Sequence, residues 1–340
     1  MELPLSLRDP WPTLAPEATP LGTGLINATY LGVADGARVV VQRVHPVFRA
    51  EVHEDIEAVT AHLASKGLLT LRLVRTRSGA LSFTDEGGAV WRVSTFLDGV
   101  SHDRFPSLPH VHSAGRLVGR YHAALADLDH TYVHVRPGVH DVAFRRAGWE
   151  RARAAGSEHR LANATEALYA ELAPLLDLTL PLGTTRRRHA HGDLKAANLL
   201  FRGDEAIALV DLDTVSAMEW VFELGDALRS WCNHTTEDDP QSRFDLPTLE
   251  TALRGYRETG PPLEREEVHG LARGVLTIAA ELCLRFLTDA LEERYFGFDA
   301  SRFATRGEHN LARARGQLEL AKSLVAQLDA AERIVRETLS

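Results

Sequence analysis

The sequence predicts an α+β protein in which a small β-rich lobe precedes a larger, mainly helical lobe. Strand-like apolar runs and turn residues dominate up to about residue 99, with one helix among them. Beyond that point apolar residues recur at helical spacing, apart from one hairpin near residues 198–213. We place the boundary after residue 98, so residues 1–98 form the N-terminal lobe and residues 99–340 form the C-terminal lobe.

The elements of the first lobe follow from local patterns. The chain up to about residue 20 is rich in proline and is expected to be irregular. A turn-rich stretch containing Gly22 and Gly24 then leads into a strand. Apolar residues at helical spacing predict a helix over 52–65, which Gly67 ends. Alternating or continuous apolar runs predict strands at 39–44, 71–76, 80–84 and 90–99.

The stretch 189–213 carries the strongest functional signal. Two apolar runs flank a turn with Gly203 and Asp204, which is typical of a β-hairpin. Pairing of these strands would bring Asn198 roughly opposite Asp211 at the open end of the hairpin. Amide and carboxylate oxygens gathered there are ligands that magnesium prefers, with Asp193 just outside them. This arrangement suits phosphoryl transfer, in which a metal holds the phosphates and a carboxylate orients the nucleophile.

The segment His191-Gly192-Asp193-Leu194-Lys195-Ala196-Ala197-Asn198 resembles the catalytic loop of the protein-kinase-like superfamily, in its small-molecule branch of aminoglycoside and choline kinases. The resemblance implies a two-lobed protein-kinase-like fold that uses ATP and Mg²⁺. It implies that Asp193 is the catalytic base and that Lys195 lies near the transferred phosphate. By the same resemblance Asn198 and Asp211 are magnesium ligands, and Asp213 is a further candidate ligand.

The same resemblance places the nucleotide in the first lobe. Phe96 and Leu97 would form the hinge whose backbone meets the adenine ring, and Gly22 and Gly24 would lie in the turn that covers the phosphates. One feature departs from the protein kinases, because no lysine occurs before Lys66 and the strand lysine is therefore missing. Gln42 or Arg43 stands at that position, and we expect Arg43 to contact phosphate and to pair with Glu54 or Glu57.

Further segments resemble the bacterial N-acetylhexosamine 1-kinases, among them 41–48, 211–215, 224–229, 285–289 and 308–315. This likeness implies that the acceptor is the anomeric hydroxyl of an N-acetylhexosamine, and it makes Asp226 a candidate substrate-binding residue. Glu281, Arg285 and Asp289 recur on one face of an apolar helix over 275–291. We interpret Arg285 and Asp289 as a polar rim for the substrate; an internal ladder of salt bridges is the alternative.

Other function classes stay open or are excluded by composition. An aminoglycoside or another small alcohol is the second candidate acceptor, and a non-catalytic nucleotide-binding pseudokinase is the alternative from another class. The spacing of His189, His191 and Asp193 also occurs in dinuclear zinc hydrolases, although residue 194 is leucine where that motif has histidine. A net charge of −9 argues against a nucleic-acid partner.

The predicted compartment is the cytoplasm. No apolar stretch reaches membrane-spanning length, and the N-terminus lacks a basic segment followed by an apolar one. The chain has two cysteines, which is too few for a disulfide framework. Lysine is rare, with Lys66, Lys195 and Lys322 the only three against thirty-five arginines. A lysine in the predicted catalytic loop is therefore mild support for a functional role, because an ammonium and a guanidinium differ beside a phosphate.

Overall fold

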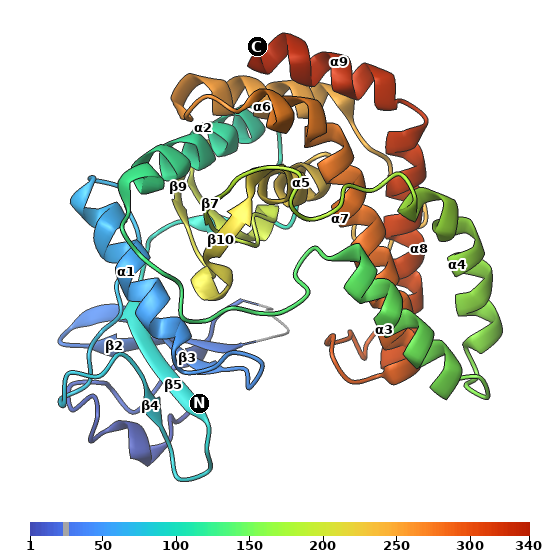
Figure 1. Ribbon diagram of the computed structural model, residues 1–340. Coiled ribbons are helices and arrows are strands. Elements are labelled where there is room, and N and C mark those ends of the chain that lie inside the picture. Colours follow the sequence, from blue (N-terminus) through green and yellow to red (C-terminus); the bar gives the residue numbers. More distant parts are fainter. Residues whose placement is uncertain (23–26) are drawn as a thin grey trace.

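A five-stranded antiparallel sheet forms the centre of the N-terminal part (Figure 1). The computed structural model describes residues 1–22 and 27–340. The strands of this sheet, in spatial order, are β1 (Thr19–Pro20), β2 (Ala28–Ala34), β3 (Ala37–Val44), β5 (Val90–Thr95) and β4 (Phe83–Thr84). Helix α1 (Val52–Ser65) has the predicted bounds, and Gly67 follows it with a φ of 77°. The predicted strand at 71–76 is wrong as a regular strand, because only Leu73 forms a bridge, to Ser94.

The two faces of this sheet have different neighbours. Val39, Val41 and Trp91 pack with Leu7 and Trp11 of the N-terminal segment. The proline-rich lead-in is therefore a buried cover for one face of the sheet and holds a short 3-10 helix, η1 (Leu5–Leu7). Val44 belongs to the opposite face and to the large core that α1 shares with the C-terminal helices. Side chains that alternate with Val41 along β3 consequently point toward the C-terminal part.

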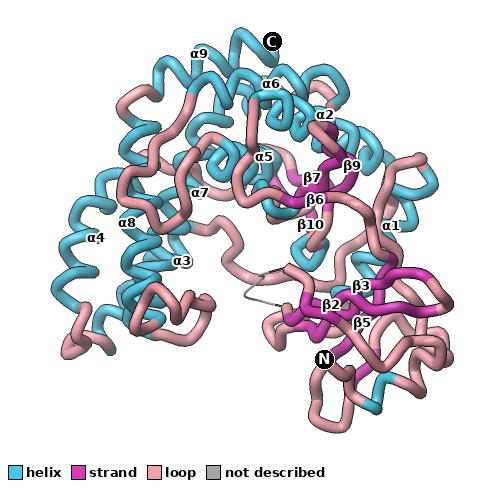
Figure 2. The backbone as a smooth tube through the Cα atoms, turned by 180° about the vertical axis from the view of Figure 1, so that it is seen from behind, coloured by secondary structure: helices cyan, strands magenta, loops and turns pink. Residues whose placement is uncertain are grey.

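The C-terminal part is mainly helical, as predicted (Figure 2). Its α-helices are α2 (Leu108–Ala124), α3 (Val142–Ala155), α4 (Ala162–Leu176), α5 (Trp220–Trp231), α6 (Leu246–Thr259), α7 (Arg265–Glu292), α8 (Arg306–Val325) and α9 (Leu328–Leu339). Short 3-10 helices are η2 (Leu125–Asp127), η3 (Ala196–Asn198) and η4 (Leu212–Thr214). Helix α7 is longer than the predicted 275–291 and packs against α5, α8 and α3.

The predicted hairpin is present and lies between the two parts of the chain. Strand β8 (Leu199–Arg202) pairs with β9 (Glu205–Leu209), and the turn is Gly203-Asp204. Strand β6 (Val100–Ser101) pairs with β8, so the chain joins the C-terminal sheet a few residues after β5 ends. The boundary at residue 98 stays a prediction. A second pair, β7 (Arg187–Ala190) with β10 (Ser216–Glu219), leads into and out of the catalytic segment.

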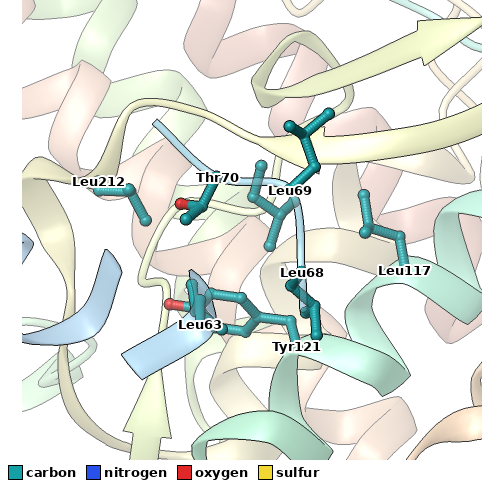
Figure 3. Close-up of a pocket in the computed structure, with 8 residues that line it drawn as sticks. Leu63, Leu68, Leu69, Thr70, Leu117, Tyr121 and Leu212 are labelled. Carbon is teal, nitrogen blue, oxygen red and sulfur yellow. The ribbon is translucent and has the colours of Figure 1, made fainter. Parts of the chain in front are cut away.

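A small, partly open pocket lies where α1, α2 and the hairpin meet (Figure 3). Leucines form most of its wall, and Thr70 and Tyr121 contribute hydroxyl groups that have no hydrogen-bond partner among the described residues. This lining is unsuited to phosphate or to a polar acceptor. The polar site lies elsewhere, at the open end of the hairpin.

Candidate active site

The catalytic segment is fixed by its backbone. Gly192 has a φ of 81°, and a Cβ added there would lie 2.4 Å from the carbonyl oxygen of Thr214. The buried carboxylate of Glu223 on α5 accepts hydrogen bonds from the backbone N–H of His191 at 2.7 Å and of Gly192 at 2.9 Å. The loop before Asp193 is therefore clamped between η4 and α5.

Asp193 and Lys195 form a close pair on this loop. The Nζ atom of Lys195 lies 2.6 Å from Oδ2 of Asp193, and the two side chains are 42% and 27% exposed. Burial acts to raise the pKa of Asp193, but the Lys195 ammonium outweighs this effect and the pKa is lowered. A carboxylate that stays ionised and reaches solvent can accept a hydrogen bond from an incoming hydroxyl.

Asn198 and Asp211 offer oxygen atoms beside this pair. The Asn198 amide nitrogen donates to the carbonyl oxygen of Asp193 at 2.8 Å, which leaves its side-chain oxygen for another partner. Asp211 has a φ of 63°, and within the described residues its carboxylate has no hydrogen-bond donor. Burial and repulsion from Asp213 raise the pKa of Asp211 to about 6. Such a carboxylate is suited to bind a divalent cation. With one oxygen each from Asn198 and Asp211, the other coordination positions of the cation would remain for phosphate oxygens.

The role of Asp213 as a further metal ligand stays a prediction, and its carboxylate is already engaged by other groups. Its buried carboxylate makes a two-pronged salt bridge with the Arg92 guanidinium from β5 and accepts a hydrogen bond from Asn27 at 2.6 Å. Burial acts to raise its pKa, but the Arg92 charge outweighs burial and the pKa of Asp213 is lowered. Three hydrogen bonds already engage this carboxylate, so Asp211 is the better candidate ligand of the two.

The structure corrects the expectation for Arg43. Its side chain is exposed and pairs across the strands with Trp91, on the face that the N-terminal segment covers. Gln42 points the other way, and its side-chain oxygen accepts a hydrogen bond from Nε of Arg92 at 2.8 Å. Glu57 pairs with two other arginines, Arg72 and Arg75. The cation that the first lobe directs toward the catalytic hairpin is thus Arg92.

The other nucleotide-site predictions are untested. Within the described part of the chain, the backbone groups of Phe96 and Leu97 form no hydrogen bonds, as a hinge that receives adenine requires. The Phe96 ring lies 4.2 Å from the Arg38 guanidinium. Gly22 has a left-handed φ of 75°, whereas Gly24 lies outside the described residues.

The three acceptor candidates have different surroundings. Asp226 on α5 binds Arg229 at 2.9 Å and helps to raise the pKa of Lys195, so it lies near the catalytic loop. Arg285 is half-buried and its guanidinium lies 5.2 Å from the centre of the Phe296 ring.

Asp289, the third acceptor candidate, is already engaged by neighbouring groups. Its buried carboxylate accepts four hydrogen bonds, from the backbone N–H groups of Arg294, Tyr295 and Phe296 and from the Asn310 amide. These four hydrogen bonds fix the loop after α7 and engage the lone pairs that a carboxylate offers. A role for Asp289 in substrate binding stays a prediction.

The zinc alternative is not supported by the geometry. The ring nitrogens of His189 bond to the Tyr132 hydroxyl and to the carbonyl oxygen of Leu128. Those of His191 bond to the Val210 carbonyl oxygen and the Asp193 backbone N–H. Among the residues that the structure describes, no group of three or more His, Cys, Asp or Glu side chains could hold a metal ion.

Sequence reasoning missed Arg92 and Glu223. Both are charged residues inside apolar runs, where a buried charge is costly unless it has a partner. Arg92 alternates with Trp91 and Val93 along a strand, which places it on the face opposite those two. That signal predicts burial with a partner, but the partner Asp213 is 121 residues away in sequence and only the folded chain reveals it.

Comparison with known proteins agrees with this geometry. Residues 17–261 match the model of a family described as the phosphotransferase enzyme family, the APH family. This match covers more than half of the chain. The chain belongs to the phosphotransferase enzyme family. Like the members of this family, it combines a sheet-bearing first lobe with a mainly helical second lobe, which confirms the predicted two-lobed fold.

Two relatives carry the name homoserine kinase. The protein from Methylobacterium nodulans is 31% identical over 213 residues, which cover 62% of this chain and 61% of the relative. The protein from Chelativorans sp. is 28% identical over 275 residues, which cover 80% of this chain and 78% of the relative. The match to the M. nodulans protein thus spans less than two thirds of that protein's length.

Solved structures share the fold. A microcompartment-associated aminopropanol kinase has a TM-score of 0.63 at 18% identity, covering 93% of both chains. An amicoumacin kinase in complex with AMP-PNP and Ca²⁺ has a TM-score of 0.61 at 15% identity, covering 89% of this chain and 87% of that one. Among the described residues, no helix is both long and apolar enough to cross a membrane.

Proposed function

We propose that the protein transfers the γ-phosphoryl group of ATP to a hydroxyl group of a small-molecule acceptor. The observation that carries this proposal is the grouping of Asp193, Lys195, Asn198 and Asp211 at the open end of one hairpin. Asp193 reaches solvent beside a lysine that lowers its pKa, and Asp211 is a carboxylate to which none of the described residues donates a hydrogen bond. A structural role alone explains neither the missing partner nor the left-handed backbone of Asp211.

In this reaction Asp193 accepts a hydrogen bond from the acceptor hydroxyl and takes its proton as the new oxygen–phosphorus bond forms. The bond between the γ-phosphorus and its bridging oxygen breaks, and ADP leaves. Lys195 stands 2.6 Å from Asp193, where its ammonium can neutralise charge on the transferred group. Asn198 and Asp211 would hold Mg²⁺, which neutralises phosphate charge when bound.

Arg92 supports the nucleotide side of this proposal. Protein kinases hold phosphates with a strand lysine that is paired to a helix glutamate. Here Gln42 stands at that strand position and Arg92 lies beside it, tied to Asp213 two residues after Asp211. We propose that this pair links the two lobes and keeps Asp211 in place. The absence of the lysine therefore does not by itself favour a pseudokinase.

Two acceptor classes fit this reaction. The first is a small hydroxy amino acid, which the names of the homoserine kinase relatives support. The second is an N-acetylhexosamine, which rests on the sequence segments that resemble the sugar 1-kinases. Both place a primary or anomeric hydroxyl before Asp193. They differ in their charged groups, because only the amino acid carries a carboxylate and an ammonium group.

A panel assay tests the proposal. Purified protein is incubated with ATP and Mg²⁺ and with L-homoserine, 3-aminopropanol, N-acetylglucosamine, N-acetylgalactosamine or an aminoglycoside. We expect ADP release that depends on one acceptor class and stops when EDTA removes the metal, with the phosphorylated position assigned by phosphorus NMR. Nucleotide binding without ADP release across the whole panel would favour the non-catalytic alternative.

A further inference from the structure

A cluster of basic side chains on the C-terminal lobe has more positive than negative charge. Its centre is the buried carboxylate of Glu281 on α7. Nδ1 of His140 lies 2.8 Å from Oε2 of Glu281, and Nε of Arg145 on α3 lies 3.0 Å from Oε1. Arg285 follows Glu281 by one helical turn. Burial acts to raise the pKa of Glu281, but the hydrogen bond with His140 and the charges of Arg285 and Arg145 lower it to about 2.

Arg285 is the member of this cluster without a partner. Within the described residues, no carboxylate lies within salt-bridge distance of its guanidinium. The guanidinium lies near the rings of Tyr295 and Phe296 instead. The acid one turn further along the same face of α7 is Asp289, whose oxygens are occupied by the loop after the helix and by Asn310. Glu281, one turn before, is already engaged by Arg145 and His140.

The cluster borders the catalytic segment. The His140 ring lies 5.9 Å from the ring of Phe222 on α5. Phe222 directly precedes Glu223, which holds the backbone of the catalytic loop. Helices α3 and α7 lie against each other on the side of the molecule across from the N-terminal lobe (Figure 1). Helix α5 therefore contacts both the catalytic loop and this cluster.

From these contacts we infer that Arg285, with Arg145 beside it, binds the carboxylate of the acceptor, so the acceptor is a hydroxy acid or hydroxy amino acid. This inference rests on the proposed phosphotransfer. Two guanidinium groups face one protein carboxylate, so one positive charge is left over, which matches one carboxylate better than a doubly charged phosphate monoester. The planar guanidinium of Arg285, which lies 5.2 Å from the centre of the Phe296 ring, can form two parallel hydrogen bonds to a carboxylate.

The matched acceptors for a test are L-homoserine and 3-aminopropanol, which differ only by the carboxylate. We expect the protein to favour L-homoserine in kcat/KM by about 10- to 100-fold, the range for hydrogen bonds to charged groups. The Arg285→Met variant should lose this preference, with a higher KM for L-homoserine and an unchanged KM for ATP. Arg146→Met is the control, because Arg146 lies on α3 but pairs with Asp177 at 2.6 Å.

Two results would overturn the inference. One is equal use of the two acceptors, or turnover of neutral sugars alone, in which case phosphotransfer stands and the carboxylate site does not. The other is an unchanged preference in Arg285→Met. If no acceptor is turned over, the proposed function fails, and calorimetry of L-homoserine binding then decides the site separately. Binding that disappears in Arg285→Met and persists in Arg146→Met supports the site, whereas no binding, or equal binding by both variants, refutes it.

Discussion

The junction between the two lobes around Asp213 and the cluster around Glu281 and Arg285 both contain buried charged groups. The two regions differ in how far these charges are paired. At the junction, Asp213 receives Arg92 and Asn27 from the first lobe. Asp55 on α1 is fully buried and accepts hydrogen bonds from the backbone N–H groups of Val133 and His134 and from His130. Each of these carboxylates is neutralised or saturated by groups from distant parts of the chain.

In the cluster around Glu281 and Arg285, the charges are only partly paired. Glu281 is paired with Arg145 and His140, yet Arg285 has no acidic partner among the described residues. The segment after the hairpin shows the same contrast, because Asp213 is paired with Arg92, whereas none of the described residues donates a hydrogen bond to Asp211. Charge that the protein cancels internally holds the fold together, whereas charge that it leaves over is available for a ligand.

The largest expected effect is at Asp193, the proposed base. Asp193→Asn keeps the shape of the side chain but removes its ability to take a proton. We expect kcat to fall by ~10²–10⁴, the usual contribution of a positioned base. Steady-state ADP release with saturating acceptor and ATP measures this change.

Stability should respond far less, because Asp193 and its partner Lys195 both reach solvent. The control is Asp204→Asn in the exposed turn of the hairpin, which should keep its rate. A nearly full rate in Asp193→Asn would show that another group orients the hydroxyl.

The second effect tests the lobe junction. Arg92→Met leaves the buried Asp213 carboxylate with Asn27 as its remaining side-chain donor. Removing one member of a buried pair typically costs about 3–5 kcal/mol of unfolding free energy. Urea denaturation measures this loss, and the double variant with Asp213→Leu should recover part of it.

Arg38→Met is the matched control for this junction. Arg38 also pairs with an aspartate, Asp98, at 3.4 Å, but both side chains are more than half exposed. Exposed pairs contribute little because water screens them. A loss in Arg38→Met as large as that in Arg92→Met would show that burial is not the cause.

A third effect concerns the pH dependence of the unfolding free energy, to which His53 near the lobe junction contributes. His53 on α1 is buried, and burial together with the nearby Arg92 lowers its pKa from 6.5 to about 4, against opposing effects of the Ala50 carbonyl and Asp213. In the unfolded chain His53 takes up a proton near pH 6.5, whereas in the folded protein it stays neutral down to about pH 4. Stability is therefore complete above pH 6.5 and falls as the pH drops toward 4.

This loss is on the order of 3 kcal/mol, from about 1.4 kcal/mol for each pH unit in that window. Urea denaturation between pH 4.5 and 7.5 measures it. The His53→Phe variant should show a smaller dependence of the unfolding free energy on pH. An unchanged dependence in that variant would assign it to another group.

Much of the fold was predictable from local patterns, because α1, β3 and the catalytic hairpin each have a clear period and a clear stop. The strand expected at 71–76 failed, since its apolar residues pack at the edge of β5 without forming a regular ladder. At the site, short-range spacing was enough to gather Asp193, Asn198 and Asp211. It could not assign Arg43 or Arg92, because the direction of a strand side chain depends on the register and on what covers each face.

The smallest expected effect is the change in stability on replacing Arg285. Arg285→Met removes a guanidinium that has no acidic partner among the described residues, so no buried charge is left unpaired. The loss is the cation–π contact with Phe296, about 0.5–1 kcal/mol, and the attraction to Glu281, which keeps Arg145 and His140 as partners. Urea denaturation beside Arg92→Met measures the difference between the two arginines. A cost for Arg285→Met that equals the cost at Arg92 would mean that the cluster around Glu281 needs Arg285 for folding and is balanced without a ligand.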